Sequence, residues 1–229
     1  MVESLVGWEK DFFLFLNSPH TPYLDGVMYL ISAPLPWIIV LIPFFILFSY
    51  KKDYREFLLL LLFIGLLVFM ADSLSSGIIK PLFQRYRPTH HPETLDAVKT
   101  VLNYRGGNYG FISGHSTNFL AFATFSSLVI RNRWYTILIF ITTLTVAYSR
   151  IYLGVHFVTD VIPGILCGML IGVFLYWLYR EARSAFFSMT LQEATVPYIK
   201  GRERIFAILI GAFYFSLWVL SPLVIQLYR

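Results

Sequence analysis

Apolar residues recur in long runs along the chain, and polar connections separate these runs. A helix needs about 20 mostly apolar residues to cross the hydrocarbon core of a bilayer, and five or six of the runs qualify. Pro34, Pro36 and Pro43 lie in the first run and predict a kink or a late helix start there. The pattern therefore predicts an all-α integral-membrane bundle of about six transmembrane helices in a single domain, with helices near 24–50, 57–79, 116–130, 134–148, 161–179 and 205–228.

The first 20 residues follow a different pattern, in which aromatic and acidic residues mix. Trp8, Phe12 and Phe15 recur near helical spacing, and Glu9 and Asp11 lie between them. This mixture predicts an amphipathic helix within residues 1–20 that lies at the membrane interface. The acidic residues and the lack of a basic leader argue against a secretory signal.

Composition supports a membrane protein. Hydrophobic residues make up 57% of the chain and charged residues 14%, whereas soluble domains carry about 25% charged residues. The formal net charge of +5 is compatible with nucleic acid or with an anionic membrane as partner. Because the basic residues lie between apolar runs, we expect the bilayer as partner and no nucleic acid.

The basic residues also predict the orientation of the bundle, because Lys and Arg are enriched in cytoplasmic connections. Eight of the 18 basic residues lie on one side of the predicted bundle, and three of these eight, Lys80, Arg87 and Arg150, belong to a candidate site whose function would set their charge. We therefore expect the connection over 81–113, a long polar loop of the kind that is usually functional, to face outward. The opposite, inward side carries ten basic residues, which are Lys51, Lys52, Arg55, Arg131, Arg133, Arg180, Arg183, Lys200, Arg202 and Arg204.

Three short polar segments interrupt the apolar pattern, and all three lie at helix ends on the outward side. They cover residues 80–88, 113–115 and 149–160. Counting the spans places these ends on the same face of the membrane, whichever way the bundle is oriented. The outward loop over 81–113 joins the first two segments.

Each segment has an ordinary structural explanation when it is considered alone. Lys80 and Arg87 are compatible with basic side chains that reach from helix ends to the interface. His156 and Asp160 share a helix face and can pair for structural reasons. Arg150 is harder to explain, because an unpaired guanidinium in an apolar stretch is unfavourable. Three cations, two histidines and a carboxylate at one membrane face together indicate a shared function.

A phosphate group is the ligand that fits this set. Arg donates forked hydrogen bonds that match phosphate oxygens, and backbone N–H groups at a helix start add further donors. A neutral imidazole can attack phosphorus, and a second, protonated imidazole can donate a proton to the leaving oxygen. Because the cations supply the positive charge, no metal or other cofactor is expected. The predicted phosphate-binding residues are Lys80, Arg87, Ser113, Gly114 and Arg150.

The order Lys80-x6-Arg87-Pro88, then Ser113-Gly114-His115, then Ser149-Arg150-x5-His156-x3-Asp160 resembles the signature of the type 2 phosphatidic acid phosphatase family. The resemblance implies that His156 is the nucleophile and forms a phosphohistidine. It further implies that His115 is the general acid and that Asp160 pairs with His156. The family usually has Pro before Ser-Gly-His, where this chain has Ile112, a difference that removes no chemical group.

The resemblance implies a lipid phosphatase of the bacterial cytoplasmic membrane whose site faces the periplasm. We expect undecaprenyl diphosphate or a lipid A phosphate as substrate, with phosphatidylglycerol phosphate and phosphatidic acid as alternatives. Arg85 and Arg105 are candidate contacts for a second phosphate or a sugar of the head group. An anion-conducting transporter subunit is the alternative of a different class, but it would distribute polar residues across several spans. The long apolar runs exclude a soluble enzyme of the haloperoxidase type.

Overall fold

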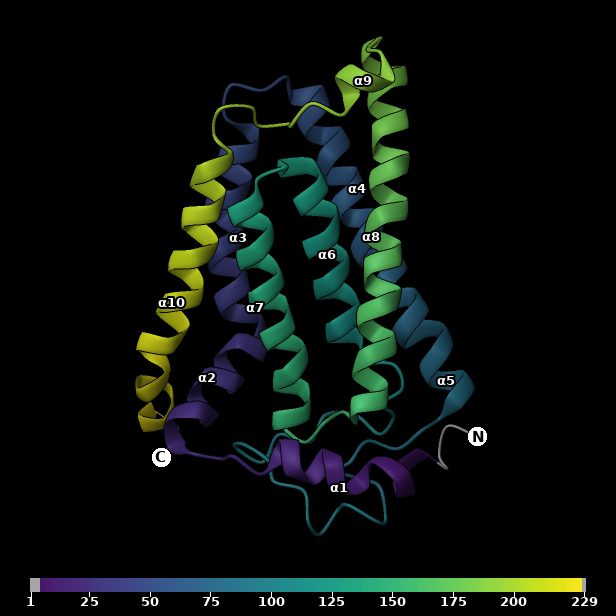
Figure 1. Ribbon diagram of the computed structural model, residues 1–229, viewed down its shortest axis with the longest axis vertical. Coiled ribbons are helices and arrows are strands. Elements are labelled where there is room, and N and C mark those ends of the chain that lie inside the picture. The colour runs from purple at the N-terminus through teal and green to yellow at the C-terminus, as the bar shows by residue number, and fades with distance from the viewer. Residues whose placement is uncertain (1–4, 228–229) are drawn as a thin grey trace.

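The computed structural model of the protein describes residues 5–227 (Figure 1). Residues 1–4 and 228–229, which include the start of the predicted interfacial helix and the end of the last predicted span, lie outside the described residues. The described part is an all-α bundle, as predicted. Its helices are α1 (Val6–Asn17), α2 (Pro22–Ser32), α3 (Pro34–Ser49), α4 (Tyr54–Asp72), the π-helical η2 (Ser73–Ile79), α5 (Lys80–Phe83), α6 (Gly114–Ile130), α7 (Arg133–Tyr152), α8 (Val158–Phe187), α9 (Leu191–Ala194) and α10 (Glu203–Leu227).

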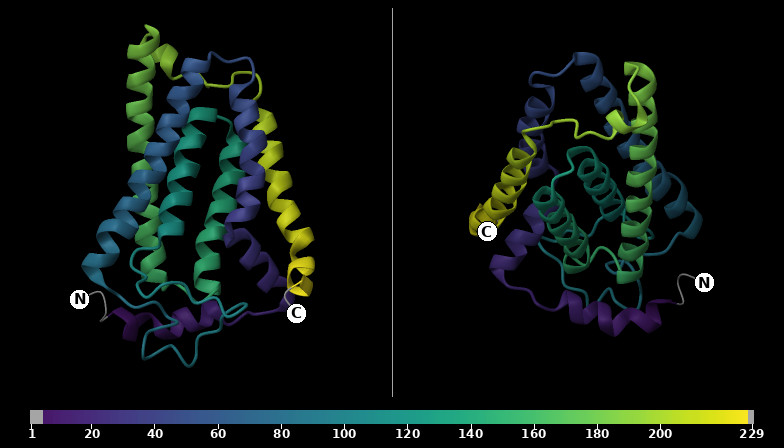
Figure 2. Two further views of the ribbon diagram at one scale, coloured as in Figure 1. Left: turned by 180° about the vertical axis from the view of Figure 1, so that it is seen from behind. Right: turned by 45° about the horizontal axis from the view of Figure 1, so that its top comes forward.

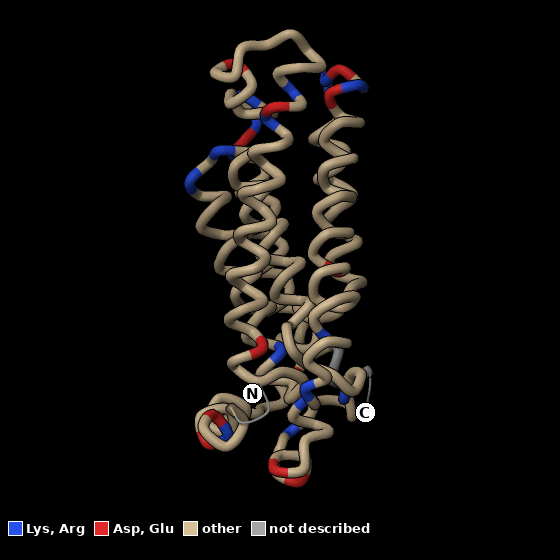
Figure 3. The backbone as a smooth tube through the Cα atoms, turned by 90° about the vertical axis from the view of Figure 1, so that its right-hand side faces the viewer, with Lys and Arg blue, Asp and Glu red and all other residues tan. Residues whose placement is uncertain are grey.

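Several of these helices are suited to cross a membrane. Within residues 5–227, four helices are long and apolar enough, and the bent pair α2–α3 makes a fifth if it counts as one span. The first of the four continues from α4 through η2 and α5. The shorter α6, with 17 residues, packs against α4, α7 and α8. Charged residues gather toward the two ends of the bundle, and the long middle part is nearly free of them (Figure 3). Four of the six predicted spans each coincide with one helix, namely α6, α7, α8 or α10, whereas the first covers the pair α2–α3 and the second covers α4 and η2.

The first predicted span is broken rather than continuous. Ala33 has an extended backbone between α2 and α3, and the two helices meet at a bend of 54°. The residue before a proline is disfavoured in helical conformation, and Pro34 is the first residue of α3. The break lies at the end of the bundle that is predicted to face outward (the outward end), where it brings Ser32 close to the polar segments.

The fifth predicted span is longer than its apolar pattern suggests. We expected it to end near residue 179, but α8 continues to Phe187. Arg183 in the extra turns donates through Nε to Glu56 Oε1 over 2.7 Å, and both side chains are buried. This ion pair holds the end of α8 against the start of α4, so the polar residues after 179 remain helical.

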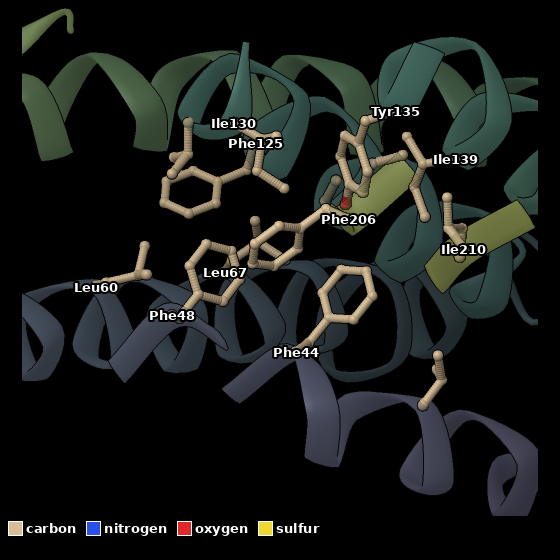
Figure 4. Close-up of a cluster of buried hydrophobic side chains, with 14 of the residues drawn as sticks. Phe44, Phe48, Leu60, Leu67, Phe125, Ile130, Tyr135, Ile139, Phe206 and Ile210 are labelled. Atoms are coloured by element: carbon tan, nitrogen blue, oxygen red, sulfur yellow. The ribbon is translucent and has the colours of Figure 1, made fainter. Parts of the chain in front are cut away.

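The apolar interior of the bundle is rich in aromatic side chains (Figure 4). Phe44 and Phe48 of α3 pack on Phe206 of α10, with ring centroids 5.0 and 4.7 Å apart. Tyr135 of α7 lies against the same group. At the outward end, α1 runs across the ends of α7 and α8 (Figures 1 and 2). This helix covers the region in which the polar segments meet.

Candidate active site

The three polar segments meet at the outward end of the bundle, next to α1 (Figure 1). The first follows η2 and enters the loop that precedes α6, the second forms the start of α6, and the third joins α7 to α8. The structure therefore brings together the helix ends that the span count placed on one face. The predicted site residues are described in turn below.

His156 and Asp160 form the most enclosed part of the site. His156 Nδ1 lies 3.5 Å from Asp160 Oδ2, and both side chains are buried. Asp160 Oδ2 also accepts a hydrogen bond from the backbone N–H of Phe157 over 2.9 Å, which ties the carboxylate to the first turn of α8. On the other side, the backbone N–H of His156 donates to Arg150 O over 3.1 Å. The imidazole is thus held with Nδ1 toward the carboxylate and Nε2 away from it.

Arg87 lies on the Nε2 side of His156. Its Nη1 is 3.3 Å from His156 Nε2 and also donates to Val155 O over 3.2 Å. Two hydrogen bonds to the later part of the same loop orient this guanidinium. The backbone N–H of Arg87 donates to Asn108 O, and Arg87 Nε donates to Tyr109 O. A cation therefore lies beside the imidazole nitrogen that faces away from Asp160.

Lys80 approaches the start of α6. Its Nζ donates to Ser76 Oγ over 3.0 Å, and a Cβ atom on Gly114 would lie 3.4 Å from the same Nζ. Glycine at this position leaves the backbone N–H groups of the first turn accessible. Within residues 5–227, no acceptor pairs with the N–H of Gly114 or of His115. These two groups and the ammonium can together bind an anion at the positive end of the helix.

Both the backbone N–H and the hydroxyl of Ser113 form hydrogen bonds within the described part of the protein, unlike the N–H groups of the next two residues. Its backbone N–H donates to Asp160 O over 2.9 Å, and its hydroxyl caps α6 by accepting from Ser116 N over 3.3 Å. The side chain is fully buried. In this conformation Ser113 fixes α6 to α8, and the accessible donors in the segment belong to the two residues that follow it.

Arg150 and His115 line a cavity of about 470 Å³ next to these groups. Arg150 lies in the last turn of α7 and is 2% exposed. It donates through Nη1 to Ser32 Oγ and through Nη2 to Tyr104 OH, the latter over 3.1 Å. Its Nε is buried and has no hydrogen-bond partner within residues 5–227. The cavity continues along α3, where Trp37, Leu41 and Phe119 also line a second, apolar pocket of about 200 Å³.

The electrostatic environment keeps His156 neutral. Burial lowers its pKa well below the ordinary value of 6.5, and the nearby positive charges of Arg87, Arg150 and Lys80 lower it further. These three charges act on one imidazole, which indicates that the predicted cations converge on it. A neutral imidazole with an unprotonated Nε2 is a competent nucleophile.

Two further buried residues belong to this region, and the sequence analysis missed the role of both. Arg85, which we expected to reach a head group, is fully buried and donates from Nη1 to Asp160 Oδ1 over 2.7 Å, so that expectation is wrong. Its Nη2 pairs with Glu9 of α1. A signal for Glu9 existed, since it lies on the face of α1 that buries Val6 and Phe13. Arg105 is exposed.

Comparisons with known proteins agree with this geometry. The model of the PAP2 superfamily matches residues 57–184, which include all three polar segments. The chain is 49% identical over 183 residues to a lipid A 4'-phosphatase of Porphyromonas gingivalis, covering 80% of this chain and 78% of that protein. It is 28% identical over 182 residues to a lipid A 4'-phosphatase of Bacteroides thetaiotaomicron, covering 79% and 81%.

A more distant relative is a phosphatidylglycerophosphatase B of Bacillus subtilis, which is 28% identical over 134 residues and covers 55% of this chain and 58% of that protein. No solved structure matches the chain at a significant level. The family match extends over more than half of the chain, and the relatives with the widest coverage act on phosphorylated lipids by name. The chain therefore belongs to the PAP2 superfamily and is a membrane-bound lipid phosphatase.

Proposed function

We propose that the protein removes the 4'-phosphate from lipid A at the periplasmic face of the bacterial inner membrane. The observation that carries this proposal is the 49% identity, over 80% of the chain, to a protein named lipid A 4'-phosphatase. The site supports it, because three cations act on His156, and two backbone N–H groups without an acceptor in residues 5–227 lie at the start of α6 beside one of these cations, Lys80. Undecaprenyl diphosphate, an equally expected substrate from the sequence, is not named by any of the relatives described above.

The reaction proceeds through a phosphohistidine. His156 Nε2 attacks phosphorus while Arg87, Lys80 and Arg150 bind the phosphate oxygens, together with the N–H groups at the start of α6. Asp160, beside Nδ1, stabilises the positive charge that the imidazole acquires on attack. His115 donates a proton to the oxygen that leaves with the sugar. Water then attacks the phosphohistidine and releases inorganic phosphate, with His115 accepting the proton from that water.

The cavity supports this assignment of the two histidines. His115 stacks on Phe119 with ring centroids 6.1 Å apart, and both line the cavity that continues toward the apolar pocket along α3. The acyl chains of a lipid fit such an apolar groove, and the phosphate then reaches the cations beside His156. In this arrangement the leaving oxygen lies on the side of His115, where a proton donor is needed.

The orientation of the bundle and the placement of α1 are part of the proposal. Ten basic residues lie at the end opposite the site, which favours a cytoplasmic location for that end. Trp8, Phe12 and Phe15 of α1 are 82%, 54% and 70% exposed. A stripe of exposed aromatic residues on a helix at this level is suited to the bilayer interface, so α1 rests on the outer surface of the membrane.

A substrate panel tests the function. Purified protein is supplied with diphosphorylated lipid A, undecaprenyl diphosphate, phosphatidylglycerol phosphate and phosphatidic acid, and kcat/KM is compared across the four lipids. We expect the highest kcat/KM for lipid A, and mass spectrometry of the product should show loss of the 4'-phosphate. A higher kcat/KM for another lipid, or loss of the 1-phosphate, would contradict the proposal.

Thiol labelling of intact cells tests the orientation. In a Cys167→Ser background, Glu93→Cys places a thiol in the outward loop, and Arg55→Cys places a matched thiol at the opposite end; both native side chains are exposed. An impermeant reagent should label the first variant in intact cells and the second only after lysis. The reverse pattern would invert the proposed topology.

A further inference from the structure

Glu9 is a buried acidic residue that the reaction described above does not use. It lies on α1, 2% exposed, and its carboxylate accepts hydrogen bonds from three sources. Oε1 accepts from Arg85 Nη2 and from Thr159 Oγ1, and Oε2 accepts from the backbone N–H of Thr159 over 3.0 Å. The carboxylate of Glu9 on α1 thus binds Thr159 in the first turn of α8, and Thr159 directly precedes Asp160.

Arg85 connects this carboxylate to the catalytic pair. Its guanidinium is fully buried between Glu9 and Asp160, to which it donates through Nη2 and Nη1. It also lies over the ring of Phe157, with 4.6 Å between the guanidinium carbon and the ring centroid. Neither acidic residue pairs with a second Arg or Lys within residues 5–227. The three side chains therefore form a linear ion-pair network, in which the positive charge of Arg85 lies between the two negative charges of Glu9 and Asp160.

The balance of charge in this network matters for His156. Arg85 alone would neutralise Asp160, and the imidazole would face a pair with no net charge. With Glu9 present, the group of three carries one net negative charge, and one of its two carboxylates lies 3.5 Å from His156 Nδ1. Charges buried in a medium of low dielectric interact more strongly than in water, so this difference acts directly on the imidazole when it becomes positive.

We propose that Glu9 is a positioning residue for the reaction of His156: it orients Arg85 and offsets its charge, so that the group of three keeps a net negative charge beside the imidazole and stabilises the phosphohistidine. The inference rests on the proposed reaction, in which His156 is the nucleophile. It makes α1 part of the catalytic unit and not only a contact with the membrane surface. The residue acts through Arg85 and Asp160 and touches neither substrate nor phosphorus.

The first test compares kcat with KM in Glu9→Gln. Because Glu9 does not contact the lipid, we expect KM to be unchanged, and kcat to fall about 10- to 100-fold, as for other outer partners of a reactive group. Glu9→Asp keeps the charge and should retain a higher kcat than Glu9→Gln. The matched control is Glu56→Gln, which breaks the buried ion pair with Arg183 at the opposite end. That control should lower Tm but leave kcat unchanged.

The second test restores the charge by a different route. Glu9→Gln combined with Arg85→Met leaves Asp160 as the one charge of the group, so the double variant should have a higher kcat than Glu9→Gln. A Glu9→Gln kcat equal to that of the wild type would overturn the proposal, as would a double variant no more active than Glu9→Gln. If Glu9→Gln does not fold, a folded double variant whose kcat has fallen more than about 100-fold overturns it.

Failure of this inference differs from failure of the proposed function. If wild-type protein turns over lipid A and the Glu9 variants match it, the role of Glu9 is refuted and the function stands. If wild-type protein releases phosphate from none of the four lipids of the panel, the proposed function fails instead.

Discussion

The spacing between α6 and α8 provides a demanding test of how the fold sets the active site. Gly164, Gly168 and Gly172 are four residues apart on α8 and face α6, an arrangement of small residues that lets membrane helices approach closely. A Cβ atom on Gly168 would lie 2.4 Å from Thr117 O, whereas ordinary van der Waals contact begins at 3.4 Å. Gly168→Ala therefore introduces an overlap of 1.0 Å with a backbone atom, which cannot rotate away as a side chain can.

The two helices must separate to relieve this overlap. The first turn of α6 carries Gly114 and His115, and α8 begins directly after His156 and carries Asp160. Separation of about 1 Å between the nucleophile and the phosphate-binding turn can cost about 100-fold in rate. The overlap should also reduce the free energy of unfolding by about 1–3 kcal/mol, as overpacking does in other tightly packed interiors.

The assay compares Gly168→Ala with Gly65→Ala in the same detergent, by Tm and by phosphate release from lipid A. Gly65 lies in α4, and a Cβ atom there would meet nothing within 4 Å. Alanine is favoured over glycine in a helix by about 0.5–1 kcal/mol, so the control should keep its Tm and kcat. Gly168→Ala should lower both. If Gly168→Ala keeps the wild-type Tm and kcat, the contact between α6 and α8 does not set the geometry of the site.

His156, its protonation and the fixed cations of the site can each be tested separately. His156→Ala should release no phosphate from lipid A while eluting as a folded protein in size-exclusion chromatography, and near-normal turnover would refute its role as nucleophile. Because the pKa of His156 lies well below 6.5, kcat/KM should persist as the pH falls through 6.5; an acidic limb centred at or above 6.5 would contradict this. Over the same range Tm should fall, because the unfolded state binds a proton that the native imidazole does not. EDTA should leave the phosphatase activity intact, because fixed Lys and Arg side chains supply the positive charge at the phosphate. A loss of activity in EDTA that an added metal ion restores would argue against this.

The sequence predicted the reacting groups because their types and spacings carry the information locally. Residues four apart on a helix share a face, which already pairs His156 with Asp160. Counting apolar runs assigns each helix end to a side of the membrane, and this placed Lys80, Arg87 and Arg150 on one face. The break at Ala33 was also foreseeable, because proline acts on its immediate neighbour.

Other features depended on how distant segments pack. The sequence analysis used Glu9 only to characterise the N-terminal helix, and it assigned Arg85 to the head group of the lipid. Nothing in the local pattern relates Glu9 to Thr159, which is 150 positions away. The contact exists because α1 runs across the outward end of the bundle and turns one face into it (Figure 1).

Local sequence and tertiary packing therefore determine different features, because they act over different distances along the chain. Periodicity, proline positions and motif spacing act within a few residues, so the sequence by itself determined the helices, the placement of the polar segments at one end of the bundle and the set of candidate reacting groups. The charge balance around Asp160 and the close approach of α6 to α8 arise between elements that are far apart in the chain. Only the tertiary structure decided them, because burial of Arg85 between two carboxylates requires three separate segments to be in place at once.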